Sequence, residues 1–191
     1  MVYTVKTYNN INQVGLRELG NGFQIDGDQK ENPDAYIIRS ENLHGVDFPD
    51  NLKVIARAGA GTNNIPIDVA TDHGIVVFNT PGANANAVKE AVIASTLLSA
   101  RDYLGANKWV NTLTGDDVPS QVEAGKKQFA GTEIAGKTLG VIGLGAIGAR
   151  IANDAVRLGM NVIGYDPYVS VETAWGLNRA IIRATEIQEI F

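Results

Sequence analysis

A glycine-rich turn between an expected strand and an expected helix constrains this 191-residue chain more than any other feature. The apolar run Thr138–Ile142 leads directly into the segment GLGAIG, whose glycines are Gly143, Gly145 and Gly148, and a helical pattern continues over residues 146–158. In a G-x-G-x-x-G turn the first glycine permits the tight turn, and the second lets a pyrophosphate approach the backbone. The third lets the helix pack against the strand. The first N–H groups of the helix then face the anion. The pattern therefore predicts the dinucleotide-binding unit of a Rossmann domain.

An acidic residue at the end of the next expected strand favours one cofactor. Asp166 follows the apolar run at 160–165 and precedes Pro167. A carboxylate at this place can accept hydrogen bonds from both hydroxyls of the adenosine ribose, and it would repel a 2′-phosphate. The sequence therefore predicts NAD rather than NADP as the cofactor. An ordinary Asp-Pro turn without a ligand is the alternative for Asp166 alone.

The residues before this motif alternate short apolar runs with helical patterns. Expected strands lie at 2–7, 35–39, 54–57 and 75–78, and expected helices at 12–19, 67–73 and 84–101. Asn12 is the expected N-cap of the first helix, and Gly20 and Gly74 are expected to end the first and second helices. Residues 111–127 have no clear periodicity and are expected to form a surface loop, and another helix is expected to begin at 185–191. Strands alternating with helices indicate an α/β fold with a mainly parallel sheet.

Composition excludes several classes of function. The net charge of −5 and the pI near 5.0 argue against a nucleic-acid or anionic-membrane partner, which needs clustered basic residues. The chain has no cysteine, so disulfides, thiolate nucleophiles and cysteine-bound metals are excluded, and no metal site is expected. The N-terminus lacks the pattern of a signal peptide, and no apolar run is long enough to span a bilayer. A soluble cytoplasmic protein is expected.

Three further blocks, together with the glycine turn, carry a family resemblance. They are ARAGAGTNN at 56–64, NTPGANAN at 79–86 continuing to Glu90, and GTEIAGKTLG at 131–140. In this order they resemble the D-isomer-specific 2-hydroxyacid dehydrogenases. The resemblance implies a flavodoxin-like substrate (lid) domain at 1–98 that lacks its returning C-terminal part. It also implies the first half of a Rossmann NAD-binding domain at 99–191, truncated at Phe191.

The resemblance also implies roles for individual residues. Substrate-binding roles fall on Arg39, Arg57, Gly59 and Asn84, and cofactor-binding roles on Ala60, Gly143, Gly145, Ala146, Ile147, Gly148 and Asp166. Arg39 matches an arginine that reaches a substrate phosphate, and the loop at 57–61 matches one that offers backbone N–H groups to the substrate carboxylate. From the residues alone, ion pairs with an Asp or Glu are the alternative for Arg39 and Arg57. Capping of the long helix is the alternative for Asn84.

The activity implied by the resemblance is NAD-dependent oxidation of a D-2-hydroxy acid. Within the family the likeness is strongest to members that act on D-3-phosphoglycerate in serine biosynthesis. Glu41, two residues after Arg39, stands where some relatives carry a second basic residue. Glycerate, lactate or hydroxyisocaproate therefore stay open as substrates, and so does a protein that binds NAD without catalysis.

The family's catalytic Arg, Glu and His are expected beyond Phe191, so no catalytic residue is assigned within this chain. His44 falls in a polar turn and His73 at a helix end, and neither is expected to replace the missing histidine. The 191-residue chain is therefore expected to be inactive by itself. Relatives also imply a homodimer formed through the nucleotide domain, which would use the long helix and residues 109–127.

Overall fold

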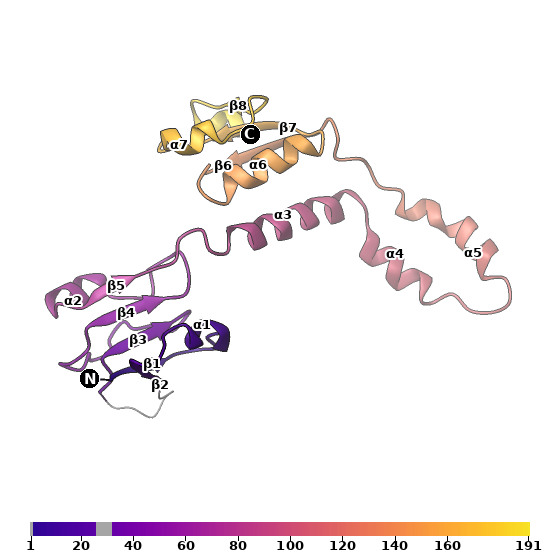
Figure 1. Cartoon of the computed structure of the whole chain (residues 1–191). Helices are drawn as coiled ribbons and strands as arrows, with labels where there is room; N and C mark the ends of the chain where they lie inside the picture. Colours follow the sequence, from indigo (N-terminus) through magenta and orange to yellow (C-terminus); the bar gives the residue numbers. More distant parts are fainter. Residues whose placement is uncertain (1, 26–31) are drawn as a thin grey trace. The chain divides into compact units, whose positions relative to one another are not determined.

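The computed structural model describes residues 2–25 and 32–191. The chain folds into two compact units, Met1–Asn84 and Ala85–Phe191 (Figure 1). Each unit has its own parallel sheet and its own apolar core. The predicted α/β class with mainly parallel strands is therefore confirmed.

The first unit has a parallel sheet with the strand order β2-β1-β3-β4-β5 among its described residues. Its strands are β1 (Tyr3–Thr7), β2 (Phe23–Ile25), β3 (Ala35–Ile38), β4 (Val54–Arg57) and β5 (Val76–Phe78), and its helices are α1 (Gln13–Arg17) and α2 (Ile67–Asp72). This is the flavodoxin-like strand order, which confirms the predicted fold of the first part of the chain. The short strand β2 was not predicted, because its three residues form an exposed edge without a buried face.

Apolar side chains from the central strands build the core of this unit. Ile38 on β3 and Ile55 on β4 are completely buried, and Phe48 packs edge-on against Tyr36. The ends of the helices follow the sequence signals. The Asn12 side chain accepts a hydrogen bond from the Val14 N–H at 2.9 Å, as an N-cap does, and Gly74 after α2 has a φ of +68°. Local capping and burial therefore act together to set the lengths of the elements.

The second unit combines a three-stranded parallel sheet, ordered β6-β7-β8, with helices. Its elements are α3 (Ala85–Ala100), α4 (Tyr103–Val110), α5 (Val118–Gly125), η2 (Lys126–Phe129), β6 (Thr138–Ile142), α6 (Gly148–Arg157), β7 (Asn161–Tyr165), α7 (Val171–Trp175), β8 (Ile182–Arg183) and η3 (Ile187–Ile190). The β6–turn–α6–β7 sequence is the predicted start of a Rossmann domain, and it is confirmed.

Helix α3 belongs to the second compact unit, whereas the sequence grouped it with the first domain and expected the boundary at 98/99. The reason is its packing on α6. The Lys89 ammonium lies 3.0 Å from the Asp154 carboxylate, and both side chains are mostly shielded from solvent. The division of the chain therefore falls between Asn84 and Ala85, before the helix.

The expectation of a surface loop at 111–127 is wrong, because α5 and the start of η2 occupy much of it. Pro119 lies in the first turn of α5, where its missing N–H costs nothing. Trp109 on α4 packs against Phe129 with ring centroids 5.2 Å apart. Helix α5 buries no residue and has few apolar side chains, so its sequence gives a weak helical pattern. At the C-terminal end of the described chain, where a helix was expected to begin, the structure has the 3₁₀ helix η3.

The pair Lys89–Asp154 predicts a measurable acid sensitivity of the second unit. The hydrogen bond from Lys89 is the main cause that holds the pKa of Asp154 below its ordinary value of 3.8. A depressed pKa contributes stability above the unfolded-state value, and this contribution is lost as the pH falls below about 4. Asp154→Asn should therefore lower the free energy of unfolding by about 1 kcal/mol at pH 7 and weaken its dependence on pH between 5 and 3. Urea titrations at several pH values measure both effects.

Glu123→Gln is the matched control, because Glu123 pairs with Lys126 on an exposed surface. It should change the free energy of unfolding by less than about 0.5 kcal/mol. Asp154 also pairs with Arg157 on α6. Equal losses in the two variants would therefore show that the ion pairs of Asp154 stabilise the unit no more than an exposed pair does.

Candidate functional site

A cavity of about 670 Å³ opens in the first unit at the carboxyl ends of its parallel strands. Its wall comes from the segments that follow β1, β3, β4 and β5. The lining residues are Asn10, Ile11, Asn12, Arg39, Ser40, Arg57, Ala58, Gly59, Ala60, Gly61, Thr80, Ala83 and Asn84. Strand β1 lies between β2 and β3, so the strand order reverses at this point of the sheet. Open α/β sheets bind their ligands at such a reversal.

The cavity has a positive wall. Among the described residues, Arg39 and Arg57 are the only charged residues that line it, and no acidic one does. Neither arginine forms an ion pair with an Asp or Glu among the described residues. The ion-pair alternative raised for them from the sequence therefore finds no support in this part of the chain. Two cations without a carboxylate partner are suited to an anionic ligand.

Arg57 also organises the loop that follows β4. Its Nε donates to the Arg39 carbonyl at 3.1 Å and its Nη1 donates to the Gly61 carbonyl. Gly59 and Gly61 lie directly against the guanidinium, because a Cβ at either position would come within 3.2 Å of Nη1. The sequence assigned Arg57 to the substrate, and the structure adds a role in shaping the loop.

The segment after β5 holds the same loop from a second side. The Asn79 amide donates to the Ala60 carbonyl at 2.7 Å, and the Thr80 N–H donates to the Gly59 carbonyl at 3.0 Å. Among the described residues, the N–H groups of Ala60 and Gly61 donate to no protein acceptor. The loop carbonyls are thus tied back to the protein while two N–H groups stay available for an anion.

Sequence reasoning missed one residue of this region. Asn9 has a φ of +64°, and its side-chain oxygen accepts from the backbone N–H groups of Arg39, Ser40 and Glu41. Asparagine tolerates this left-handed conformation better than most residues. The tandem asparagines after β1 were a local signal, but the partners lie about thirty positions away in the sequence.

The glycine turn of the second unit has the geometry that its pattern predicts. Gly143 has a φ of +88°, which permits the sharp exit from β6. A Cβ at Gly148 would overlap the carbonyl oxygen of Gly143, whereas a Cβ at Gly145 would meet no atom within 4 Å. Gly148 is therefore required for close packing of α6, and Gly145 leaves open space beside the backbone.

Asp166 is fixed next to this turn by two backbone groups. Its Oδ2 accepts from the Leu144 N–H and its Oδ1 from the Tyr168 N–H, each at 2.8 Å. The bond to Tyr168 is that of an Asp turn, as the alternative proposed, and the bond to Leu144 ties the carboxylate to the glycine turn. Each oxygen retains a lone pair for a hydroxyl donor.

Two backbone N–H groups at the start of α6 are available to bind a ligand. Among the described residues, the N–H groups of Ala146 and Ile147 donate to no protein acceptor. The anion-binding amides, the open space at Gly145 and the carboxylate of Asp166 together fit the pyrophosphate and ribose of a dinucleotide.

Neither histidine belongs to the cavity wall. The His44 ring lies 3.0 Å from the Asn63 carbonyl, and the His73 ring lies 2.9 Å from the Val69 carbonyl at the end of α2. Within 2–25 and 32–191, no three His, Asp or Glu side chains are grouped as metal ligands, and no helix is long and apolar enough to cross a bilayer.

The chain matches a known family over most of its length. The family model described as D-isomer specific 2-hydroxyacid dehydrogenase, catalytic domain, matches residues 32–185. The chain belongs to this family.

Members of this dehydrogenase family are also found among curated sequences. The chain is 36% identical to D-3-phosphoglycerate dehydrogenase of Methanocaldococcus jannaschii, a match that covers 86% of the chain and 30% of the relative. It is 40% identical to hydroxypyruvate reductase of Thermotoga maritima over 70% of the chain and 42% of that relative. The chain therefore spans less than half the length of these relatives.

Solved structures of dehydrogenases share the fold. D-mandelate dehydrogenase of Rhodotorula graminis, at 22% identity, matches with a TM-score of 0.74 over 100% of this chain and 63% of that one. NAD+-bound 3-phosphoglycerate dehydrogenase of Entamoeba histolytica, at 23% identity, matches with a TM-score of 0.66 over 100% of this chain and 60% of that one. At these identities the likeness concerns the fold.

The overlap at Gly148 predicts a large effect of one added methyl group. Gly148→Ala should lower the free energy of unfolding of the second unit by at least about 2 kcal/mol, because α6 must move away from β6. Gly145→Ala is the matched control and should change it by less than about 1 kcal/mol, since its methyl group would enter open space. Urea unfolding followed by circular dichroism measures both, and equal values would refute the assigned packing role.

Proposed function

We propose that the protein carrying this chain oxidises a D-2-hydroxy acid with NAD+, and that its substrate is D-3-phosphoglycerate, which becomes 3-phosphohydroxypyruvate. The observation that carries the proposal is the cavity at the strand-order reversal, whose wall has two arginines and, within 2–25 and 32–191, no acidic residue. D-3-phosphoglycerate carries a carboxylate and a phosphate, so it presents an anionic group at each end. Family membership and the names of the similar curated sequences support the same class of reaction.

The cofactor would be held by the second unit. The N–H groups of Ala146 and Ile147 would bind the pyrophosphate, and Asp166 would bind the adenosine ribose. Bound NAD+ supplies the oxidant that takes the hydride from C2 of the acid. The Leu144–Asp166 hydrogen bond supports this assignment, because it sets the ribose-binding carboxylate beside the turn that would bind the phosphates.

The substrate would be held by the first unit. The free N–H groups of Ala60 and Gly61 would bind the carboxylate, and Arg57 would keep them in place through the loop carbonyls. Arg39 would bind the phosphate. The Asn84 amide would form hydrogen bonds with the other polar groups of the acid. Fixed donors at both ends of the substrate would orient C2 for oxidation.

The hydroxyl proton needs an acceptor. The lining residues that the structure describes include no His, Asp or Glu. By resemblance to the family, an arginine, a glutamate and a histidine from a part of the protein outside this chain would clamp the carboxylate and move the proton. The 191-residue chain should therefore bind ligands without turnover.

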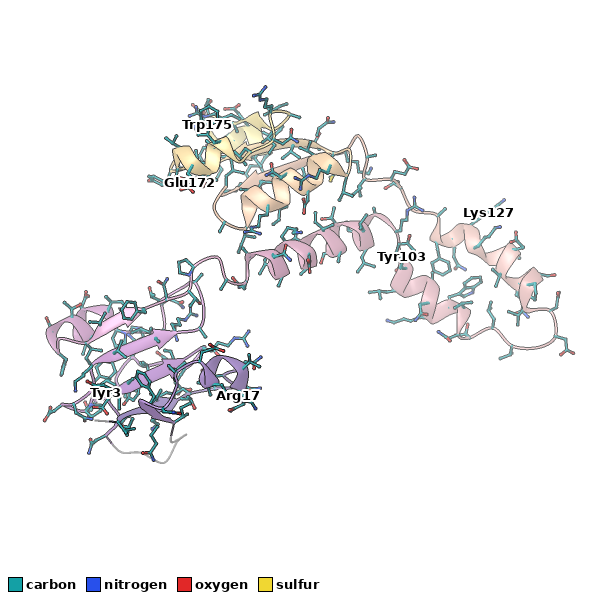
Figure 2. The ribbon with its side chains drawn as sticks, in the orientation of Figure 1. Tyr3, Arg17, Tyr103, Lys127, Glu172 and Trp175 are labelled. Carbon is teal, nitrogen blue, oxygen red and sulfur yellow. The ribbon has the colours of Figure 1, made fainter. Side chains whose placement is uncertain are left out.

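We also propose a homodimer built through the second unit. An apolar hollow of about 380 Å³ lies between α4 and η2 and includes Tyr103, Trp109 and Phe129. Tyr103, at the first position of α4, and Lys127, on η2, are labelled in Figure 2. Tyr103, Leu104 and Val110 expose apolar surface on α4, which supports a protein partner here.

Removal of the Arg39 charge tests the substrate. In the full-length protein, Arg39→Gln should raise the KM for D-3-phosphoglycerate at least about tenfold, because the phosphate loses a charge-assisted partner. The KM for D-glycerate, which lacks the phosphate, should stay within about twofold. Arg17→Gln is the control: Arg17 is an exposed arginine on α1 outside the cavity (Figure 2). NADH formation from D-3-phosphoglycerate, D-glycerate, D-lactate and D-hydroxyisocaproate measures specificity, and no activity on the phosphorylated acid would overturn the proposed substrate.

Neutralisation of Asp166 tests the cofactor. Asp166→Asn should weaken NAD+ binding by about tenfold, because the ribose loses an ionised acceptor and one anchor of the turn is lost. NADP+ binding should weaken less, so discrimination between the two cofactors should shrink. Glu172→Gln on α7 is the control, since this carboxylate lies elsewhere in the second unit (Figure 2). Calorimetric titration gives both affinities, and unchanged discrimination would contradict the assignment.

A further inference from the structure

Asn9 links the turn after β3 to the acidic residue beside the cavity. Its Oδ1 accepts from the Ser40 and Glu41 N–H groups, each at 2.8 Å, and from the Arg39 N–H at 3.3 Å. Its Nδ2 donates to the Glu41 Oε2 at 3.2 Å. One amide side chain therefore holds both the backbone of this turn and the carboxylate that the turn carries.

Only an uncharged amide of this length satisfies both partners. The three N–H groups require an acceptor, and the Glu41 carboxylate requires a donor. An aspartate at position 9 would accept from the N–H groups but would place a second negative charge against Glu41. A glycine would adopt the positive φ of Asn9 without strain, but it would leave both partners unbound.

The position of Glu41 matters because it is the acidic residue closest in sequence to Arg39. Glu41 does not line the cavity, and it forms no ion pair with Arg39, although both residues belong to the described chain. The main chain of Glu41 is also fixed, because the Asn64 side-chain amide donates a hydrogen bond to the Glu41 carbonyl. The only carboxylate of this turn is thus bound outside the wall that carries the two arginines.

We propose that Asn9 is a positioning residue that keeps the Glu41 carboxylate away from Arg39 and thereby makes the cavity selective for acids with a second anionic group. The inference rests on the proposed function, because it assigns Arg39 to that second group. With its carboxylate held by Asn9, Glu41 does not neutralise the arginine.

A reciprocal exchange of the two side chains tests the proposal. Asn9→Asp alone places two carboxylates against each other and should release Glu41 toward Arg39. The Kd for D-3-phosphoglycerate should then rise about tenfold, while the Kd for D-glycerate should change by less than about twofold. The double variant Asn9→Asp, Glu41→Gln restores one donor, one acceptor and the original charge of the pair. It should bring the Kd back to within about threefold of the wild-type value. Calorimetry on the 191-residue chain measures these constants.

Two single variants separate charge from structure. Glu41→Gln keeps an acceptor for the Asn9 amide and removes the charge, so it should bind D-3-phosphoglycerate as well as the wild type or slightly better. Asn9→Gly keeps the backbone conformation and releases Glu41, so it should weaken binding of the phosphorylated acid selectively. An unchanged Kd in Asn9→Asp, no recovery in the double variant, or equal weakening for both acids would each overturn the proposal.

A ligand-free measurement keeps this inference distinct from the proposed function. Phenylglyoxal modification of Arg39, followed by peptide mass spectrometry with Arg17 as internal reference, reports whether Arg39 is paired. Asn9→Asp should slow modification at least about threefold, and the double variant should restore it. If the wild type binds neither acid, the proposed substrate is wrong, while the modification rates still decide the role of Asn9. Unchanged rates would overturn that role even if the acids bind as expected.

Discussion

Parallel pairing of β1 with strands on both of its sides is the constraint from which the first unit derives its binding site. The registers Val5 with Ile25 and Val5 with Ala35 place β1 between β2 and β3, so successive connections leave the sheet in opposite directions. Connections that diverge leave a crevice at the carboxyl ends of the strands. The residues that line the cavity follow β1, β3, β4 and β5. Buried residues such as Ile38 and Ile55 therefore act on function indirectly, because they hold the strand ends that carry the polar groups.

Each unit uses a charged side chain to organise the backbone groups of its loops. In the first unit, the Arg57 guanidinium binds the carbonyls of Arg39 and Gly61. In the second unit, the Asp166 carboxylate binds the N–H groups of Leu144 and Tyr168. Each of these side chains lies at the end of one strand and bonds the loop that follows a neighbouring strand. A loop that is held before the ligand arrives loses less conformational entropy on binding. The charged group then serves twice, as an anchor for the loop and as part of the surface that the ligand meets.

The sequence could predict the features that are local or periodic. The glycine turn, the buried central strands and the N-cap at Asn12 each have a signal within a few residues, and the structure contains all of them. It could not predict α5, because this helix buries no residue and its few apolar side chains give no clear helical period. It also missed Asn9, whose partners lie in the turn after β3. Hydrogen bonds between residues thirty positions apart depend on strand pairing, which no local pattern of an asparagine reveals.

The charge of the whole chain and the charge of its cavity have opposite signs. The chain has a net charge of −5, yet the described wall of the cavity carries two arginines and no carboxylate. A positive cavity in a negative chain requires that nearby carboxylates be held by other partners. An unpaired carboxylate would move toward an exposed guanidinium and neutralise it. Asn9 meets this requirement for Glu41 with a neutral hydrogen-bond donor. A neutral donor holds a carboxylate without adding a charge of its own, so the field of Arg39 at the cavity is left for the ligand. Selectivity for a doubly anionic acid would then depend on the position of an uncharged side chain that never contacts the acid.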